Sequence, residues 1–317
     1  MDHQLCGRFR TLRAYLPDEL NESTTLDFHN NGSIRNYCPN GDSGNTKECK
    51  TDLDKINAAC LWLFQQNIII NIDSLSKEKS EAFIIYIMIW LSYMLNLKNV
   101  NNIKSLKDFY TNHIKNNTHY TTCNKSDNYC SNSLKNKTGY NNFKEFIKRN
   151  ECFMSINITD MSKFYGAFKS LCNMYNEIDA NKPTCKKYLE KAKEFVAKYN
   201  ELNNVSDITE DSPYYQILPT LSNDYNNFKN YCNTNKVDCS DIPSLSPINT
   251  TQNPVQSSEP SSKVTSSSSS IKNKLIPVLS IIVAVPIFLG IFYKYSLFGF
   301  RKKCKKIKKK INIRLEE

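Results

Sequence analysis

The chain has 317 residues, of which 40% are hydrophobic and 23% are charged, and its formal net charge is +11. This composition excludes a polytopic membrane protein and a wholly disordered chain, while the length suffices for one or two domains with a buried core. The eight glycines form neither GxGxxG nor GxxxxGK[ST], so the sequence lacks the loops that hold nucleotide phosphates.

The N-terminal segment, residues 1–16, differs from a secretory signal peptide. It carries Asp2 and three arginines, and it has no apolar run as long as a signal-peptide core. We therefore expect membrane insertion to depend on an internal signal.

Helical periodicity dominates between residues 50 and 232. In residues 158–178, apolar side chains recur every three or four positions from Met161 to Tyr175, and Thr159 or Asp160 supplies an N-cap. Few segments alternate with a period of two residues, so we expect little or no sheet. The same helical spacing predicts helices at 53–66, 76–97, 103–114 and 185–202, with shorter ones near 140–149 and 221–231.

The apolar run at residues 82–95 has a length more typical of a buried core helix than of a membrane span. A span here would also divide the cysteines between two compartments. We therefore predict that this helix lies at the centre of a bundle, with Trp62 and Trp90 packed near it and amphipathic helices around it. Two polar, asparagine-rich loops, at 29–50 and 116–139, each contain two cysteines.

Eleven of the twelve cysteines precede residue 240, which suits an oxidising compartment. No two cysteines are spaced CxxC, so a thioredoxin-like redox motif and most structural zinc sites are excluded. Cys60 and Cys172 lie on apolar helical faces and are either buried thiols or disulfide partners. Disulfide bonds are predicted, with the pairing open, among Cys6, Cys38, Cys49, Cys123, Cys130, Cys152, Cys185, Cys232 and Cys239. Spacing alone suggests two local pairs, Cys123 with Cys130 and Cys232 with Cys239.

Signatures of catalysis and metal binding are missing from the sequence. His113, His119, Cys123 and Cys130 could be combined into a zinc site, but their spacings match no common zinc finger, and a disulfide is the stronger alternative. There is no GxSxG motif, no HExxH motif and no cysteine-protease pattern. We therefore predict no catalytic residue, no metal site and no cofactor.

The composition changes after Cys239. Residues 244–270 are rich in serine and proline and poor in apolar residues, which predicts a disordered stalk behind an ectodomain at 1–243. A transmembrane segment is predicted at 271–296, because its core, 275–293, is uncharged and nearly spans a hydrocarbon layer of about 30 Å. Residues 297–317 then form a short basic tail.

The positive charge of the chain is concentrated in this tail, since residues 1–250 carry a net charge of only +1. We therefore predict no nucleic-acid partner. By the positive-inside rule the C-terminus lies in the cytosol and the N-terminus outside. Cys304 is a candidate for S-palmitoylation, the alternative being an unmodified thiol. The residues predicted to stop transfer and to contact anionic lipid are Arg301, Lys302, Lys303, Lys305, Lys306, Lys308, Lys309 and Lys310.

A series of motifs carries a resemblance to a known family. The motifs are, in order, LPDEL (16–20), IRNYCP (34–39), CKTDLDKINAACLWLF (49–64), KSEAFIIYIMIWLSYMLNLK (79–98), IKSLKDFYTNHI (103–114), FYGAFKSLCNMYNEI (164–178), KYLEKAKEFVAKYNELNN (187–204) and LPTLSNDYNNFKNYC (218–232), before the stalk, the span and the lysine-rich tail. Together they resemble the Plasmodium interspersed repeat (PIR) family, variant antigens of malaria parasites, and most of all its rodent-parasite branch, yir, bir and cir. The resemblance covers essentially the whole chain.

The resemblance implies a helical, cysteine-containing ectodomain, export without a standard signal peptide, and display on or near the infected red cell surface. It implies roles in antigenic variation, immune evasion or adhesion. It carries over no catalytic residue. The cysteines that lie in the family motifs carry over as structural residues, and they are Cys38, Cys49, Cys60, Cys172 and Cys232.

We therefore expect an all-α, cysteine-rich helical bundle on a stalk and a single membrane span. The expected function is that of a variant surface antigen that meets host receptors or antibodies, at the infected red cell surface or the parasite vacuolar membrane. The alternative is an internal parasite or vacuolar membrane protein with a structural or trafficking role. Membrane lipid is the expected partner of the span.

Overall fold

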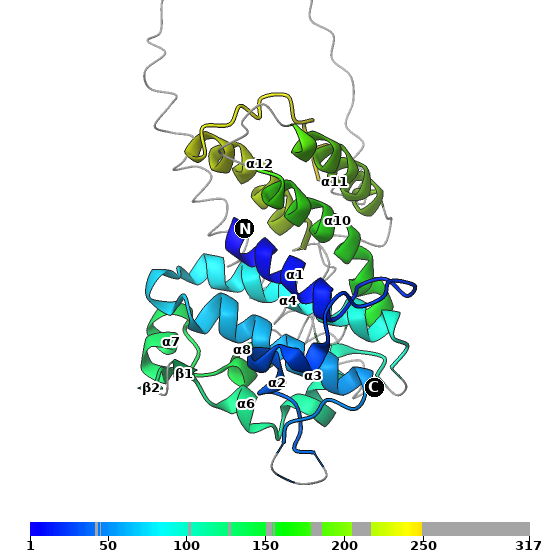
Figure 1. Ribbon diagram of the computed structural model, residues 1–317. Coiled ribbons are helices and arrows are strands. Elements are labelled where there is room, and N and C mark those ends of the chain that lie inside the picture. The colour runs from blue at the N-terminus through cyan, green and yellow to red at the C-terminus, as the bar shows by residue number, and fades with distance from the viewer. Residues whose placement is uncertain are drawn as a thin grey trace, which may run out of the picture. The chain divides into compact units, whose positions relative to one another are not determined.

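In the computed structural model, helices surround one long apolar helix, α4 (Lys77–Leu97) (Figure 1). Its side chains from Ala82 to Leu95 are all buried except that of Tyr93. The structure describes residues 1–248 except 42, 43, 45, 101, 102, 126, 127, 150–153, 155, 179–185 and 205–216. Within this part, α4 is the one helix long and apolar enough to cross a membrane, and 78% of its most apolar window is buried inside the molecule. The prediction of a buried core helix at 82–95 is confirmed.

The remaining elements follow in chain order around α4. The α-helices are α1 (His3–Tyr15), α2 (Gly32–Arg35), α3 (Asp52–Phe64), α5 (Leu106–Phe109), α6 (Thr118–Thr121), α7 (Ser131–Thr138), α8 (Phe143–Arg149), α10 (Ile158–Asn176), α11 (Lys187–Asn203) and α12 (Ile217–Thr234). Short 3₁₀ turns lie at Phe28–Asn30 and Ile72–Ser74, and π-helical turns at Gln65–Ile69 and Tyr110–Ile114.

Within the N-terminal segment 1–16, residues 3–15 form an amphipathic helix, α1, which the sequence analysis did not predict. The Asp2 carboxylate caps it by accepting a hydrogen bond from the Leu5 N–H at 2.9 Å. Leu5, Phe9 and Leu12 are buried along one face. The Phe9 ring packs edge-on against the Phe168 ring, with centroids 4.8 Å apart. The first residues of the chain therefore belong to the core.

The N-cap of α10 is Asn157, so the prediction of Thr159 or Asp160 was wrong by a few residues. The Asn157 side chain accepts a hydrogen bond from the Thr159 N–H at 2.8 Å. Asp160 lies in the first turn, where its charge suits the helix dipole. Further along α10, the Phe168 ring stacks on the Tyr86 ring of α4 with centroids 4.8 Å apart, so aromatic contacts join α1, α4 and α10.

The helices predicted at 53–66 and 103–114 each change to π-helical hydrogen bonding before they end. The Ile70 N–H bonds to the Gln65 carbonyl at 3.0 Å, five residues back. The buried Asn67 side chain donates to the Leu63 carbonyl at 2.8 Å and accepts from Arg8 at 2.9 Å. Because it occupies the carbonyl that the Asn67 N–H would use in an α-helix, this side chain favours the wider turn.

The two polar loops contain more regular structure than expected. Helix α2 lies in the first, and α6 and α7 lie in the second. The strands of the described residues are β1 (Asn124–Lys125) and β2 (Asn128–Tyr129), which pair antiparallel with Asn124 opposite Tyr129. One hairpin with two residues in each strand is the sheet found in the described residues, so the expectation of little sheet is confirmed there.

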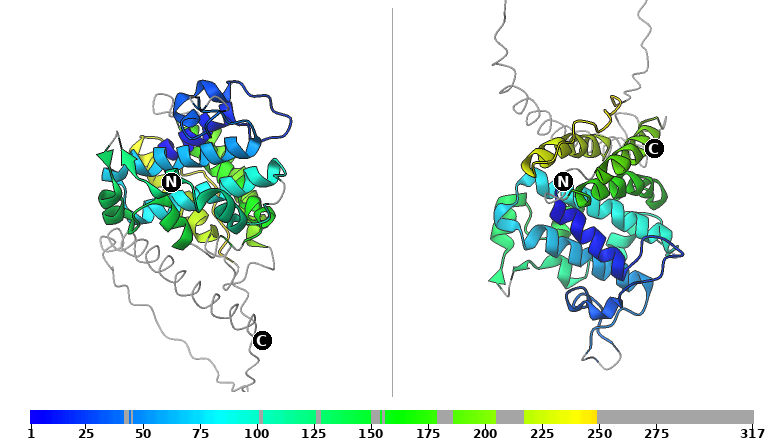
Figure 2. Two further views of the ribbon diagram at one scale, coloured as in Figure 1. Left: turned by 90° about the horizontal axis from the view of Figure 1, so that it is seen from below. Right: turned by 45° about the horizontal axis from the view of Figure 1, so that its top comes forward.

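Helices α11 and α12 lie together on one side of the unit, with α10 beside them (Figure 2). Helix α12 begins four residues before the predicted 221, because Pro219 falls in its first turn, where a missing N–H costs little. The chain then stays on these helices beyond residue 243. The Tyr225 hydroxyl donates to the Pro243 carbonyl at 2.7 Å, and the Asn203 amide donates to the Pro247 carbonyl at 2.8 Å. The compact unit therefore ends at Ile248, five residues past the predicted boundary.

Glu194 on α11 is expected to make stability depend on pH in the acid range. Burial opposes its charge, but the Lys198 and Lys191 ammonium groups, 3.0 and 3.1 Å from its carboxylate oxygens, outweigh burial and lower the pKa of Glu194 to about 2. The stabilisation is therefore complete above the unfolded pKa of about 4.5 and is lost as the pH falls toward 2. Because the side chain is 37% exposed, we expect about 1 kcal/mol or less. Urea unfolding at pH 5 and pH 2.5 should show a smaller decrease for Glu194→Gln than for the wild type.

Candidate functional site

The longest cross-link of the described residues joins the first helix to the second long helix of the core. Cys6 on α1 is bonded to Cys172 on α10, 166 residues away, with Cα atoms 4.9 Å apart. Of the two alternatives for Cys172, the structure therefore shows the disulfide partner. Its apolar surroundings gave no indication of this, because the partner helix α1 had not been predicted.

Three further disulfides are local. Cys38 is bonded to Cys49, 11 residues away, and closes the first polar loop. The pair Cys123–Cys130 closes the β1–β2 hairpin, and Cys232–Cys239 ties the end of α12 to the segment that follows. The last two are the pairs that spacing alone suggested.

Among the described cysteines, Cys60 is the unpaired one, and it is completely buried. Burial raises the pKa of its thiol to about 12, so the reactive thiolate is scarce at neutral pH. Cys60 therefore acts as a small apolar core residue. Cys152, Cys185, Cys304 and the basic cluster from Arg301 to Lys310 lie outside the described residues.

The hypothetical zinc site at the second loop is not assembled. Both of its cysteines, Cys123 and Cys130, are consumed by their disulfide. His113 lies against the Phe109 ring and His119 against the Tyr37 ring, at centroid distances of 5.2 and 5.4 Å. Burial lowers the pKa of both histidines. Their side chains pack as neutral aromatic groups.

The LPDEL motif places a buried carboxylate between α4 and α10. Asp18 is fully buried, and its carboxylate accepts hydrogen bonds from the Tyr165 hydroxyl and, at 3.0 Å, from the Lys169 ammonium. The Tyr93 hydroxyl donates to the Asp18 carbonyl at 2.7 Å. Burial, followed by the Asp18 charge, raises the pKa of Tyr165 well above its ordinary value. The motif thus fastens the chain after α1 to both core helices.

Oxygens of Asp18, Glu19 and Glu22 also lie within 4.8 Å of one another. Asp18 is already bonded to Tyr165 and Lys169, and Lys169 also pairs with Glu19 at 3.1 Å. Asp18 and Glu19, two of the three carboxylates, therefore belong to an ion-pair network centred on Lys169.

A second buried carboxylate, Asp224 on α12, lies beside the N-terminus. It accepts hydrogen bonds at 2.5 Å from the Met1 amine and from the Tyr86 hydroxyl of α4. The Tyr175 hydroxyl donates to the Asp224 carbonyl at 3.1 Å. Asp224 therefore connects α12 to α4, to α10 and to the N-terminus.

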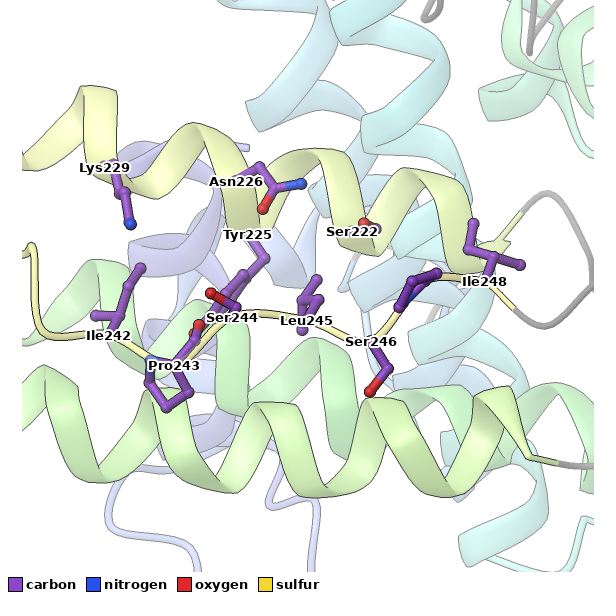
Figure 3. A pocket seen from close by; sticks show the side chains of 11 residues that line it. Ser222, Tyr225, Asn226, Lys229, Ile242, Pro243, Ser244, Leu245, Ser246 and Ile248 are labelled. Carbon is purple, nitrogen blue, oxygen red and sulfur yellow. The ribbon is translucent and has the colours of Figure 1, made fainter. Parts of the chain in front are cut away.

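A cavity of about 320 Å³ lies between α12 and the segment 242–248 (Figure 3). Tyr225, Asn226 and Lys229 line it from α12, and Ile242, Leu245 and Ile248 line it from the segment. The Tyr225 hydroxyl is engaged by the Pro243 carbonyl. Lys229 is the single titratable lining group with a charge at neutral pH, so this cavity provides no acid–base pair for catalysis.

Comparison with known proteins decides which family this fold and cysteine framework represent. The family model described as Plasmodium variant antigen protein Cir/Yir/Bir matches residues 6–294. The chain belongs to this family. A solved structure described as that of a Plasmodium PIR protein ectodomain is similar at 31% sequence identity and a TM-score of 0.51, covering 78% of this chain and 99% of that one. No curated protein matches the chain.

Membership in the Cir/Yir/Bir family gives the site residues their interpretation. Four of the five cysteines in the family motifs, Cys38, Cys49, Cys172 and Cys232, are in disulfides, and Cys60 is packed in the core. The motif cysteines therefore have structural roles, and we look for the function of this Cir/Yir/Bir protein in its exposed loops and surface charges.

Proposed function

We propose that this chain is displayed by a single-pass anchor on or near the surface of the infected red cell. There its ectodomain acts in antigenic variation, immune evasion or adhesion to a host receptor. The observation that carries the proposal is the match to the variant antigen family, which extends from residue 6 to residue 294 and so includes the apolar residues 275–293.

The disulfide framework supports a role in display. Four disulfides in the described residues fasten the first helix, two polar loops and the end of α12. Such a framework keeps a helical core while the exposed residues of the loops change, because those side chains contribute little to packing. We propose that antibodies and host receptors contact the loops at 29–50 and 116–139. Catalysis is no part of this proposal.

The membrane features belong to the same proposal. Residues 275–293 would form the span, with the N-terminal side facing the host and the tail in the cytosol. The eight basic residues between Arg301 and Lys310 would stop transfer and contact anionic lipids. Cys304 among them would be a palmitoylation site.

Antibody labelling of intact infected red cells tests the display. Separate antibodies against residues 1–243 and 301–317 should give a signal for the ectodomain and none for the tail. Mild trypsin treatment should remove that signal. Labelling that requires permeabilisation would contradict display and would indicate the alternative, an internal membrane protein with a structural or trafficking role.

A further inference from the structure

Charge is distributed unevenly over the ectodomain, although its sum is close to zero. Between Lys98 and Arg149 the sequence has ten Lys or Arg and three Asp or Glu, a net charge of +7. Because residues 1–250 sum to +1, the rest of them carries −6. The basic segment contains α5 to α8, and Figure 1 places α6, α7 and α8 on the side of the unit away from α11 and α12.

Most lysines of this segment are exposed to solvent. Lys107 interacts with the Asp108 charge and Lys137 with the Asp73 charge, but neither forms an ion pair in the described residues. Within the described residues, the lysine of this segment that forms an ion pair is Lys125, with Asp73 at 2.5 Å. A positive charge without a local partner raises the electrostatic potential over this surface and attracts anions. The exposed lysines are Lys104, Lys107, Lys115, Lys135, Lys137 and Lys148.

Three of the lysines form a defined group, called here the basic patch: Lys115, Lys144 and Lys148. The Lys144 ammonium donates to the Lys115 carbonyl at 2.6 Å, which brings α8 to the end of the π-helical turn. Lys148 follows Lys144 by one turn on the same helix, so the two side chains share a face. The exposed amides of Asn112 and Asn116 add hydrogen-bonding groups close by in the chain.

We propose that the basic patch binds a sulfated polysaccharide of the host. This inference rests on the proposed display of the ectodomain and names a class of partner for it. Lysine ammonium groups are compact charges on flexible stems and suit sulfate groups repeated along a polymer, while asparagine amides bind its hydroxyls.

Two other anionic partners fit the surface less well. A lipid surface is bound by basic helices that also insert apolar side chains. The exposed large hydrophobic residues of the described chain are Leu20, Leu26, Ile70 and Tyr129, and none lies on α8 or in the π-helical turn. Single-stranded nucleic acid requires exposed aromatic rings for stacking, and these helices offer none.

Heparin binding by the full-length chain in a neutral detergent tests the proposal. All variants carry glutamine at the nine basic residues of the tail, which are the eight between Arg301 and Lys310 and Arg314, so that the tail makes no basic contribution. Combining Lys115→Gln, Lys144→Gln and Lys148→Gln should weaken binding by about tenfold or more and reduce the slope of affinity against salt by about 2 to 3. The matched control combines Lys187→Gln, Lys193→Gln and Lys229→Gln, exposed lysines of α11 and α12. It has the same net charge, and its affinity should change by less than about twofold.

Equal weakening in the two triple variants would overturn the proposal, because net charge would then explain the binding. Undiminished heparin binding by the patch variant would overturn it as well. So would patch-dependent binding to vesicles containing phosphatidylserine without any binding to heparin, which would indicate a membrane surface. Thermal unfolding of both variants shows that each is folded. Failure of the heparin experiment would not contradict display of the ectodomain, because antibody labelling of intact cells tests display independently.

Discussion

Replacement of Cys6 and Cys172 together by alanine is expected to lower the free energy of unfolding by about 5 kcal/mol. The bond connects residues 166 positions apart, so its loss releases a very long loop in the unfolded chain. It also removes the covalent link between α1 and α10, whose remaining contacts include the Phe9–Phe168 ring pair. Urea unfolding followed by circular dichroism measures the loss.

The control for this prediction is the double replacement of Cys123 and Cys130. That disulfide closes a loop of only 7 residues, so its removal should cost about 2.5 kcal/mol. Excess reductant breaks all four described disulfides of the wild type, so it should lower the free energy of unfolding by more than either double replacement does. Equal losses in the two double variants would contradict the dependence on loop length, and unchanged melting of the wild type in reductant would contradict the role of the disulfides altogether.

Asp18→Ala is expected to lower the free energy of unfolding by about 3 kcal/mol. The carboxylate is fully buried, and its removal leaves the Tyr165 hydroxyl and the Lys169 ammonium without their acceptor. Burial alone would lower the pKa of Lys169, but hydrogen bonding and attraction by Asp18 outweigh burial and raise it. Lys169 remains about one-quarter exposed, so the expected loss lies at the low end for a buried pair.

Two variants make the Asp18 prediction specific. Asp18→Asn keeps an acceptor for the Tyr165 hydroxyl and should lose less stability than the alanine variant. Glu19→Ala removes a carboxylate that pairs with the same lysine but is 65% exposed, so we expect at most about 0.5 kcal/mol. A Glu19→Ala loss as large as that of Asp18→Ala would show that the surface pair, rather than the buried carboxylate, stabilises this region.

Much of the helical content could be predicted because it depends on local spacing. The stripe from Met161 to Tyr175 follows the helical period closely, and the length of the apolar run at 82–95 indicates a core helix; the structure contains α10 and α4 there. The prediction was less accurate at helix ends. The π-helical turn at Gln65–Ile69 depends on the Asn67 side chain and on Arg8 from another helix, and no local spacing reveals either contact.

The basic patch escaped the sequence analysis because charge was summed over 250 residues. A count over the shorter window from Lys98 to Arg149 would have revealed the excess of +7. Such a count would not have shown which lysines lie together. Lys115 and Lys144 are 29 positions apart, and the packing of α8 against the preceding turns brings them into contact.

The sequence by itself determined the helical class, the buried central helix and the family, because each depends on residue order or on short-range periodicity. It also suggested the two short-range disulfides, since seven residues of chain keep the two cysteines of each pair close together. Only the tertiary structure decided the Cys6–Cys172 bond, the role of Asp18 and the end of the folded unit at Ile248. These features require residues far apart in the chain to meet, and that meeting is decided by the packing of whole helices.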